Sequence, residues 1–410
     1  MLGKSIIQRL FRTLHTNRLT IEYWDGTHET FGHEGIIVGT LTLKSASVLK
    51  DFVKNAEDGF VENYLSGQIE FSGRLHDLVL LAVQNQLTIP SRLASGWHRW
   101  FAHGLNRATS ISQQQRDIAH HYDLGNDFYQ LFLDPSMTYS CAYFRTEQDS
   151  LETAQRQKVD HTLKKLNLKR GERLLDIGSG WGQLIIQAAK QSGVTAHGIT
   201  LSKEQVTETT RRIKAEKLEK RVSVSLMDYR DIPKFGARYD KIVSVGMFEH
   251  VGRPNLPVFM DTVNAVLDDG GLLLLHFITQ LTEGRGGSFG DRYIFPGGYI
   301  PSVRETLALL PARDFRLLDA ENLRYHYALT LDAWVRNFER NLPKVKQIFR
   351  DNAARLGDRW DGEVSIDKFL KIWHLYLEGS AANFRGGALE LHQFLISKGV
   401  NNELPLTRAA

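Results

Sequence analysis

Short apolar runs alternate with longer amphipathic stretches between about residue 170 and residue 280. The runs "RLLDIG", "VTAHGIT", "VSVSLMDY", "YDKIVSVGMFEH" and "GLLLLHFI" have the length and character of strands. Between them, "GQLIIQAAKQSG", "KEQVTETTRRIKAEK" and "LPVFMDTVNAVLDDG" carry apolar residues at helical spacing. This alternation predicts an α/β fold, with a parallel sheet covered by helices. The pattern is helical over about 330–386, and we expect "ALELHQFLISKG" to form a final edge strand.

The first hundred residues have a different pattern, which predicts a separate small α+β region. "RLTIEYW", "IIVGTLTL" and "SGQIEFSG" are typical of strands, while "LKDFVKNAEDGFVENYLSG" and "LHDLVLLAVQNQ" have helical spacing. Pro90 and the polar "TSISQQQ" then bound a linker. We therefore predict an N-terminal domain over 1–88, a linker over 89–115 and the large α/β domain over 116–410.

Composition indicates a globular protein: 42% of the 410 residues are hydrophobic and 24% are charged. A single cysteine excludes an internal disulfide framework and fits a reducing cytosol. The net charge of +4 is too small to argue for nucleic acid. No run resembles a signal peptide or a membrane span, so we expect a cytoplasmic protein, although "MLGKSIIQRLFRTLH" could form a basic amphipathic helix at a membrane surface.

Charge is distributed unevenly along the chain. Between Asp77 and Asp117 there is no acidic residue, and this interval combines basic with aromatic side chains: Arg92, Trp97, Arg99, Trp100, Phe101, Arg107 and Arg116. Arginine beside interfacial aromatics is typical of surfaces that meet anionic lipid headgroups. The alternative is an ordinary helix that packs its aromatic residues on a core and leaves its arginines in solvent.

The glycine-rich stretch "LLDIGSGWG", Leu174 to Gly182, is the strongest local motif. A strand leads through Asp176 into a tight turn, where glycine lets the backbone approach a bound nucleoside. The acidic residue before the first glycine and the D-x-G-x-G-x-G spacing differ from the G-x-G-x-x-G of dinucleotide enzymes. The next strand ends in "GITLS" without an acid for a ribose, which weakens that alternative further. The turn resembles motif I of S-adenosylmethionine-dependent methyltransferases.

Further stretches narrow this resemblance: "HHYDLGNDFYQLFLDPSMTYSCAYF", "SVGMFEHVG", "LLLLHFI", "DRYIFPGGYIPS" and "HYALTLDAW". Together with the glycine turn they resemble the cyclopropane-fatty-acyl-phospholipid synthases, a family that includes the mycolic acid cyclopropane synthases. The resemblance covers about 115–400, and it implies a Rossmann-like class I methyltransferase domain with a mostly parallel seven-stranded sheet. Residues 1–110 match the family's small N-terminal lipid-binding domain only loosely.

The resemblance also implies the chemistry. S-adenosylmethionine would donate a methyl group to a cis double bond in an acyl chain of a membrane phospholipid, and bicarbonate would act as the base while a cyclopropane ring closes. The matching catalytic positions are Cys141, Glu249, His276, Ile278 through its backbone, and Tyr327. The matching cofactor positions are Tyr139, Ser140, Asp176, Gly178, Ser179, Gly180, Gly182, Thr200, Leu201, Gln205, Asp228 and Tyr229. The resemblance further implies a homodimer that associates peripherally with the inner face of an anionic membrane, and no metal.

Each position also has a structural alternative. His276 could be a core histidine, Glu249 a helix cap and Tyr327 a core residue, while nearby aromatics could line an acyl tunnel or simply fill the core. At the level of function, the alternatives are an enzyme that adds a methyl or methylene branch to the same alkene, an N-methyltransferase of a small amine, and a catalytically silent lipid-binding module. Because a methyl group passes directly from sulfonium to alkene, we expect Cys141 to shape the anion pocket and not to act as a nucleophile.

Overall fold

A computed structural model describes residues 2–54, 56–86, 124–283, 289–352 and 365–406. These residues form two compact units. The N-terminal unit comprises the described parts of 2–104, 289–296 and 334–389, and the large-sheet unit comprises 124–283, 297–333 and 390–406. The predicted linker, 89–115, lies outside the described residues, as does the acid-free arginine and tryptophan segment within it.

The N-terminal unit is α+β, as its pattern predicts. Its sheet has the order β2-β1-β3-β4, in which β1 and β3 are parallel and the other pairs antiparallel. The elements are α1 (Leu2–Phe11), β1 (Arg18–Glu22), β2 (His28–Phe31), β3 (Ile37–Leu43), α2 (Val48–Lys54), α3 (Ala56–Leu65), β4 (Ile69–Gly73), α4 (Leu75–Gln84), η5 (Gly290–Ile294), α13 (Leu342–Asp351) and α15 (Ile366–Gly386). The predicted helix over 49–67 is thus two helices, and β2 is an additional strand.

Helix α15 explains why 334–389 groups with the N-terminal residues and not with the rest of the predicted 116–410 domain. It packs along α4, where the backbone N–H of His76 donates to the Glu378 carboxylate at 3.0 Å. Gly386 lies so close to α4 that an added Cβ would stand 2.5 Å from Val83. The C-terminal helices therefore extend the core of the N-terminal unit.

The basic first helix uses its apolar side within its own unit. Ile7, Leu10 and Phe11 are buried, and the Phe11 ring meets Phe31 with centroids 5.8 Å apart. Lys4 donates to Asp25 at 2.6 Å. These apolar residues of α1 are therefore occupied by the protein core and do not form a face for a membrane.

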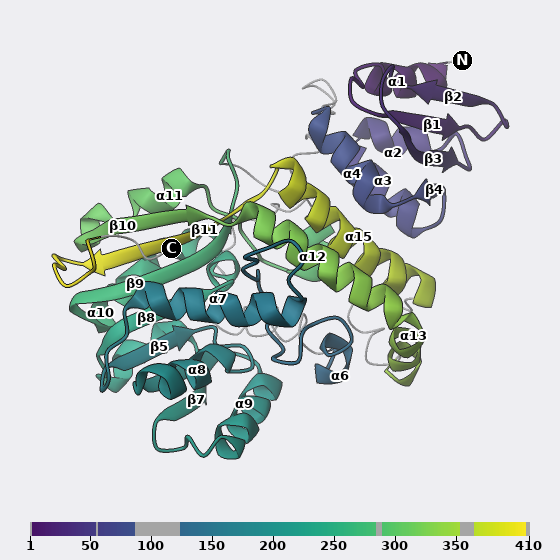
Figure 1. Ribbon diagram of the computed structural model, residues 1–410. Coiled ribbons are helices and arrows are strands. Elements are labelled where there is room, and N and C mark those ends of the chain that lie inside the picture. The colour runs from purple at the N-terminus through teal and green to yellow at the C-terminus, as the bar shows by residue number, and fades with distance from the viewer. Residues whose placement is uncertain (1, 55, 87–123, 284–288, 353–364, 407–410) are drawn as a thin grey trace. The chain divides into compact units, whose positions relative to one another are not determined.

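The large-sheet unit contains a seven-stranded sheet of order β10-β11-β9-β8-β5-β6-β7 (Figure 1). The five strands from β9 to β7 are parallel neighbours, whereas β11 pairs antiparallel with both β9 and β10. The strands are β5 (Arg173–Ile177), β6 (Thr195–Thr200), β7 (Val222–Leu226), β8 (Tyr239–Val245), β9 (Leu267–Thr279), β10 (Phe315–Asn322) and β11 (Glu390–Lys398). This is the mostly parallel α/β sheet that the sequence predicts.

The expectation that 388–399 forms an edge strand is wrong. β11 lies inside the sheet, and the edge is β10, which the sequence pattern did not reveal. The reason is visible in the side chains. β10 buries only Phe315 fully, while its remaining residues are polar or partly exposed, so it lacks an apolar run. The five consecutive buried residues of β11 are what an inner strand requires.

Two layers of helices cover the large sheet. Side chains that alternate along each strand separate the two layers: Leu174, Val243 and Leu274 face α7, α8 and α9, and Leu175, Ile242 and Leu275 face α10 and η2. The helices of this unit are α6 (Asn126–Tyr129), α7 (Leu151–Leu166), α8 (Gln183–Ser192), α9 (Lys203–Ala215), η2 (Tyr229–Phe235), η3 (Phe248–His250), η4 (Arg253–Asn255), α10 (Leu256–Val266), α11 (Val303–Ala308) and η6 (Pro311–Arg313), with α12 (Arg324–Arg340) crossing into the other unit. Across the described ranges, no helix is both long and apolar enough to cross a bilayer.

Candidate functional site

The glycine turn between β5 and α8 forms the floor of the site. The backbone N–H groups of Gly178 and Ser179 both donate to the carbonyl of Ile199 at 3.0 Å, which ties the turn to the end of β6. Gly178 and Gly180 have φ values of +89° and +52°. A Cβ on Gly180 would meet no atom within 4 Å, so this side of the turn faces open space. The backbone is thus shaped to pass under a ligand.

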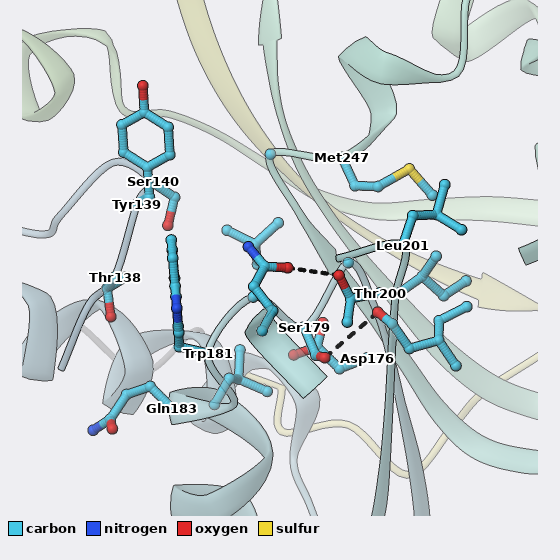
Figure 2. Close-up of a pocket in the computed structure, with 18 of the residues that line it drawn as sticks. Thr138, Tyr139, Ser140, Asp176, Ser179, Trp181, Gln183, Thr200, Leu201 and Met247 are labelled. Atoms are coloured by element: carbon cyan, nitrogen blue, oxygen red, sulfur yellow. Dashed lines mark hydrogen bonds between the residues drawn. The ribbon is translucent and has the colours of Figure 1, made fainter. Parts of the chain in front are cut away.

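A cavity opens above this turn, and the residues predicted for the cofactor gather around it (Figure 2). All of them except Gly182 line its wall: Tyr139, Ser140, Asp176, Gly178, Ser179, Gly180, Thr200, Leu201, Gln205, Asp228 and Tyr229. In Figure 2 Tyr139 and Ser140 lie on one side, and Thr200, Leu201 and Met247 lie on the other. Segments from six parts of the sequence therefore converge on one hollow at the carboxyl ends of the strands.

Gly182 does not line the cavity. It begins α8 with φ of +81°, and a Cβ at this position would stand 2.4 Å from the Thr209 methyl carbon of α9. The third glycine of the motif therefore permits α8 and α9 to approach closely.

Two side-chain pairs hold the far wall of the cavity. The Thr200 hydroxyl donates to the Gln205 amide oxygen at 2.6 Å, an interaction drawn in Figure 2. Asp228 accepts two hydrogen bonds of 2.8 Å from the guanidinium of Arg230, so this carboxylate is already neutralised within the protein. The Tyr229 hydroxyl beside it is buried and has no hydrogen-bond partner in the described ranges.

Asp176 is the buried acid of the site. It is 3% exposed, and burial raises its pKa to about 7, against the opposing charge of Lys158. Its Oδ1 atom is buried, and no described residue forms a hydrogen bond with it. The cavity therefore combines the unmatched acceptor of Asp176, the glycine turn, and the apolar side chains of Ile199 and Met227. This combination fits a ligand that has a cationic group at one end and a flat base at the other. S-adenosylmethionine has this combination of groups, and the predicted cofactor residues that line the cavity would hold it.

The residues predicted to bind an anion lie beside this cavity and not in its wall. Glu249 stands in η3, three residues after Gly246, which is the first residue beyond β8. Its Oε1 accepts from the backbone N–H of Ile278 at 2.6 Å, so Glu249 bridges β8 to the end of β9. Burial raises the pKa of Glu249 to about 7, and its Oε2 is buried without a hydrogen-bond partner among the residues described. The backbone N–H of Ile278, which we predicted to bind the anion, thus donates its hydrogen bond to Glu249 in this structure.

His276 occupies the last position at which β9 pairs with β8, opposite Val245. Gln393 of β11 places its amide nitrogen 3.1 Å from His276 Nδ1, so Nδ1 accepts and the ring proton lies on Nε2. Burial, reinforced by the nearby positive charges of Lys158 and Lys165, lowers the pKa of His276 well below its ordinary value. The neutral ring therefore presents a buried Nε2–H that has no acceptor among the residues the structure describes.

Cys141 and the backbone of Tyr327 both approach the carbonyl of Leu323, just before α12. The Cys141 sulfur lies 3.9 Å from the carbonyl of Leu323, and the Tyr327 N–H donates to the same carbonyl at 3.2 Å. The thiol is completely buried and donates to the carbonyl of Ala142 at 3.2 Å. Burial raises its pKa far above the ordinary value, so the sulfur is a neutral thiol.

Two of the aromatics that could have lined a tunnel belong to the core. Phe248 and Phe277 are fully buried and pack edge to face, with centroids 5.3 Å apart. Tyr143 instead stacks between two imidazoles, with ring centroids 4.2 Å from His161 and 4.7 Å from His326.

Sequence reasoning missed two polar residues of this region. Lys158 of α7 lines the cavity and is 3% exposed, and Gln393 is completely buried beside His276. A lysine within "ETAQRQKVDHTLKK" looks like part of a solvated helix face, and Gln393 is one polar residue in an apolar strand. Only the packing of α7 and β11 on the sheet brings them to the site.

Comparison with known proteins identifies the family. Residues 109–394 match the family model described as mycolic acid cyclopropane synthetase, and residues 6–91 match a domain of unknown function, DUF7884. A probable fatty acid methyltransferase of Pseudomonas putida is 42% identical over 400 residues, which cover 95% of each chain. The cyclopropane-fatty-acyl-phospholipid synthase of Escherichia coli K12 is 38% identical over 289 residues, covering 70% of this chain and 69% of its own.

A solved structure adds the cofactor. The crystal structure of the mycolic acid cyclopropane synthase CmaA1, complexed with SAH and CTAB, is 32% identical with a TM-score of 0.60, and covers 69% of this chain and 98% of its own. SAH is the demethylated form of the methyl donor expected in the cavity of Figure 2. The chain belongs to the mycolic acid cyclopropane synthetase family and is an S-adenosylmethionine-dependent methyltransferase.

Proposed function

We propose that this protein methylates the cis double bond of unsaturated acyl chains in membrane phospholipids and closes a cyclopropane ring, with bicarbonate as the base. One observation carries the proposal. Glu249, in η3 just after β8, and His276, on the neighbouring strand β9, each present a buried polar atom that has no hydrogen-bond partner among the described residues. A buried acceptor or donor that the protein leaves unmatched is costly, so such a pair is typical of a place for a small polar ligand.

The proposed reaction balances as an alkene plus an activated methyl group giving a cyclopropane, a proton and the demethylated cofactor. Bound S-adenosylmethionine supplies an electrophilic methyl group, and bicarbonate would take up the proton. An alkene needs no deprotonation, so the enzyme's task is to align it and exclude water. Neutral His276 donates through Nε2, and Glu249, with a pKa of about 7, can exist as the acid or the carboxylate at neutral pH. These two groups fit the binding of a small hydrogen carbonate ion better than that of an apolar chain.

The chief alternative is transfer of a methyl group to a fatty acyl chain without ring closure. The Pseudomonas putida relative is named only as a probable fatty acid methyltransferase, and it matches almost the whole chain. In this alternative the proton leaves from elsewhere and a branch remains. The same buried pair could then serve a different proton transfer, so the product must decide between the two.

Mass spectrometry of lipids distinguishes these products. The purified protein is incubated with S-adenosylmethionine and vesicles of cis-monounsaturated phospholipid, with saturated phospholipid as the control. A cyclopropane gains one CH₂ and resists ozonolysis, whereas a methylene branch gains the same mass and is cleaved. A cleaved or reductant-dependent product contradicts ring closure. Methyl transfer to a small amine with no lipid product would reject the lipid assignment, and no transfer to any acceptor would favour a silent lipid-binding module.

We also propose peripheral association with an anionic membrane surface. The support is the acid-free interval with its arginines and tryptophans, which lies outside the described residues. Neutralising three of these arginines should weaken binding to anionic vesicles in a flotation assay. The test triple is Arg92→Gln, Arg99→Gln and Arg107→Gln, and the control triple on the large-sheet unit is Arg211→Gln, Arg238→Gln and Arg316→Gln. Equal binding of both triples to vesicles would contradict the assignment of this interval.

A further inference from the structure

Lys158 is a buried cation whose charge is opposed by Asp134 and Asp176, neither of which lies within ion-pair distance. It lies on α7, is 3% exposed and forms no ion pair with any described residue. Within the described part of the chain its ammonium makes one hydrogen bond, to the Ser140 hydroxyl at 3.0 Å, which leaves two of its three N–H donors unused there. A buried charge is expensive when unpaired, and here burial lowers the pKa of Lys158 to about 8.

The wall around Lys158 is rigidly built. Gln155, one turn earlier on α7, donates its amide to the carbonyls of Thr138 and Ser140 at 3.2 Å and 2.8 Å. The Ser140 hydroxyl accepts from Lys158, and among the described residues its own proton has no acceptor. Three donors, two from Lys158 and one from Ser140, therefore converge without an anion to receive them.

These donors belong to the cofactor cavity. Lys158 and Ser140 both line it, together with Asp176 and the glycine turn, whereas Cys141, Glu249 and His276 do not. The same hollow thus holds an orphaned acceptor on Asp176 and a lysine ammonium on α7. Such a pair is complementary to a zwitterion, and the amino-acid end of the methyl donor is one.

We propose that Lys158, assisted by the Ser140 hydroxyl, binds the α-carboxylate of the methionine end of the cofactor. The carboxylate supplies the missing counterion, and the charge-assisted hydrogen bond fixes the chain that carries the reactive sulfur. Lys158 is therefore a cofactor-binding residue that sets the position of the methyl group. This inference rests on the methyltransferase assignment and is independent of ring closure.

Binding of two ligands that differ only by the carboxylate tests it. Calorimetry compares S-adenosylhomocysteine with its decarboxylated form, S-adenosyl-3-thiopropylamine, on the wild type and on Lys158→Met. We expect the substitution to lower the affinity for S-adenosylhomocysteine by about 10- to 100-fold, which corresponds to the loss of a charged hydrogen bond. The affinity for the decarboxylated ligand should stay within about threefold of wild type. The exposed Lys164→Met on the same helix is the matched control and should change neither affinity.

Two results would overturn the assignment. If Lys158→Met lowers the affinity for both ligands equally, the lysine only supports the fold. If S-adenosylhomocysteine binds unchanged while the bicarbonate needed for half-maximal activity rises, the lysine serves the neighbouring anion and not the cofactor. Ser140→Ala gives a second measurement should Lys158→Met not fold, with a smaller but equally carboxylate-selective loss expected. The binding measurements need no lipid, so they do not depend on which lipid product the enzyme makes.

Discussion

The Glu249 carboxylate accepts a 2.6 Å hydrogen bond from the backbone N–H of Ile278, and this bond joins the turn after β8 to the end of β9. One carboxylate oxygen thus fixes two strand ends, while the other is buried and unmatched. A purely structural cap would use the residue's hydrogen-bonding capacity more fully. The arrangement instead fixes Glu249 in place and leaves Oε2 for a ligand.

Glu249→Gln should lower kcat strongly and leave cofactor affinity nearly intact. The amide keeps the size and can still accept from Ile278, but it cannot take up or release a proton, so we expect a loss of about 100-fold or more in lipid turnover. Calorimetry with S-adenosylhomocysteine should give a dissociation constant within about twofold of wild type. The exposed Glu219→Gln is the control, and wild-type turnover in Glu249→Gln would remove this carboxylate from the mechanism.

The same substitution should change the pH dependence of stability. Burial raises the pKa of Glu249 in the folded protein from 4.5 to about 7. The folded state then binds the proton more tightly, so the stabilisation from protonation is complete below pH 4.5 and is lost as the pH rises through about 7. Between pH 5 and pH 8 the free energy of unfolding of the wild type should fall by about 2–3 kcal/mol relative to that of Glu249→Gln. Urea unfolding at both pH values measures this; parallel curves would show that Glu249 keeps an ordinary pKa.

Gly182→Ala should destabilise the protein more than a glycine replacement in open space. At φ of +81° an alanine is strained by about 1 kcal/mol, and its Cβ would overlap the Thr209 methyl 2.4 Å away, adding about 1–3 kcal/mol. Gly171→Ala, with φ of +91° and no atom within 4 Å of its Cβ, isolates the strain alone. Thr209→Ser in the Gly182→Ala background deletes the clashing methyl group and should recover about 1–2 kcal/mol. No recovery in thermal or urea unfolding would refute the close approach of α8 and α9.

Cys141→Ser should retain activity within about tenfold of wild type. The thiol is completely buried and its pKa is strongly raised, so it is not a thiolate nucleophile. Because it is the only cysteine, an aromatic disulfide reagent should detect no reactive thiol in the native protein and one after unfolding. Complete loss of turnover in a folded Cys141→Ser protein, or rapid labelling of the native chain, would restore a covalent role for the sulfur.

The sequence predicts the parallel core and the cofactor cavity well because both depend on local patterns. Each buried strand is a short apolar run, and the residues of the glycine turn are contiguous. Three features depend on contacts between distant segments and could not be predicted in this way. β10 is too polar to look like a strand, α15 gives no local sign that it packs on α4, and Lys158 and Gln393 become functional only through the elements packed against them. The role of Gly182 in helix packing likewise depends on Thr209, which lies 27 positions later in the sequence.

The place of β11 has a consequence for how the protein is made. Residues 390–398 insert between β9 and β10, both of which are synthesised earlier. Until these residues have emerged from the ribosome, the inner edge of β9 has no partner and His276 lacks Gln393. The parallel half of the sheet can assemble during synthesis, but the edge that will carry the predicted catalytic histidine stays open to pairing with other chains. A nascent chain stopped before β11 would already contain the residues of the cofactor cavity and yet be an aggregation-prone intermediate. The site is therefore complete only when the last strand has been synthesised and has paired with β9.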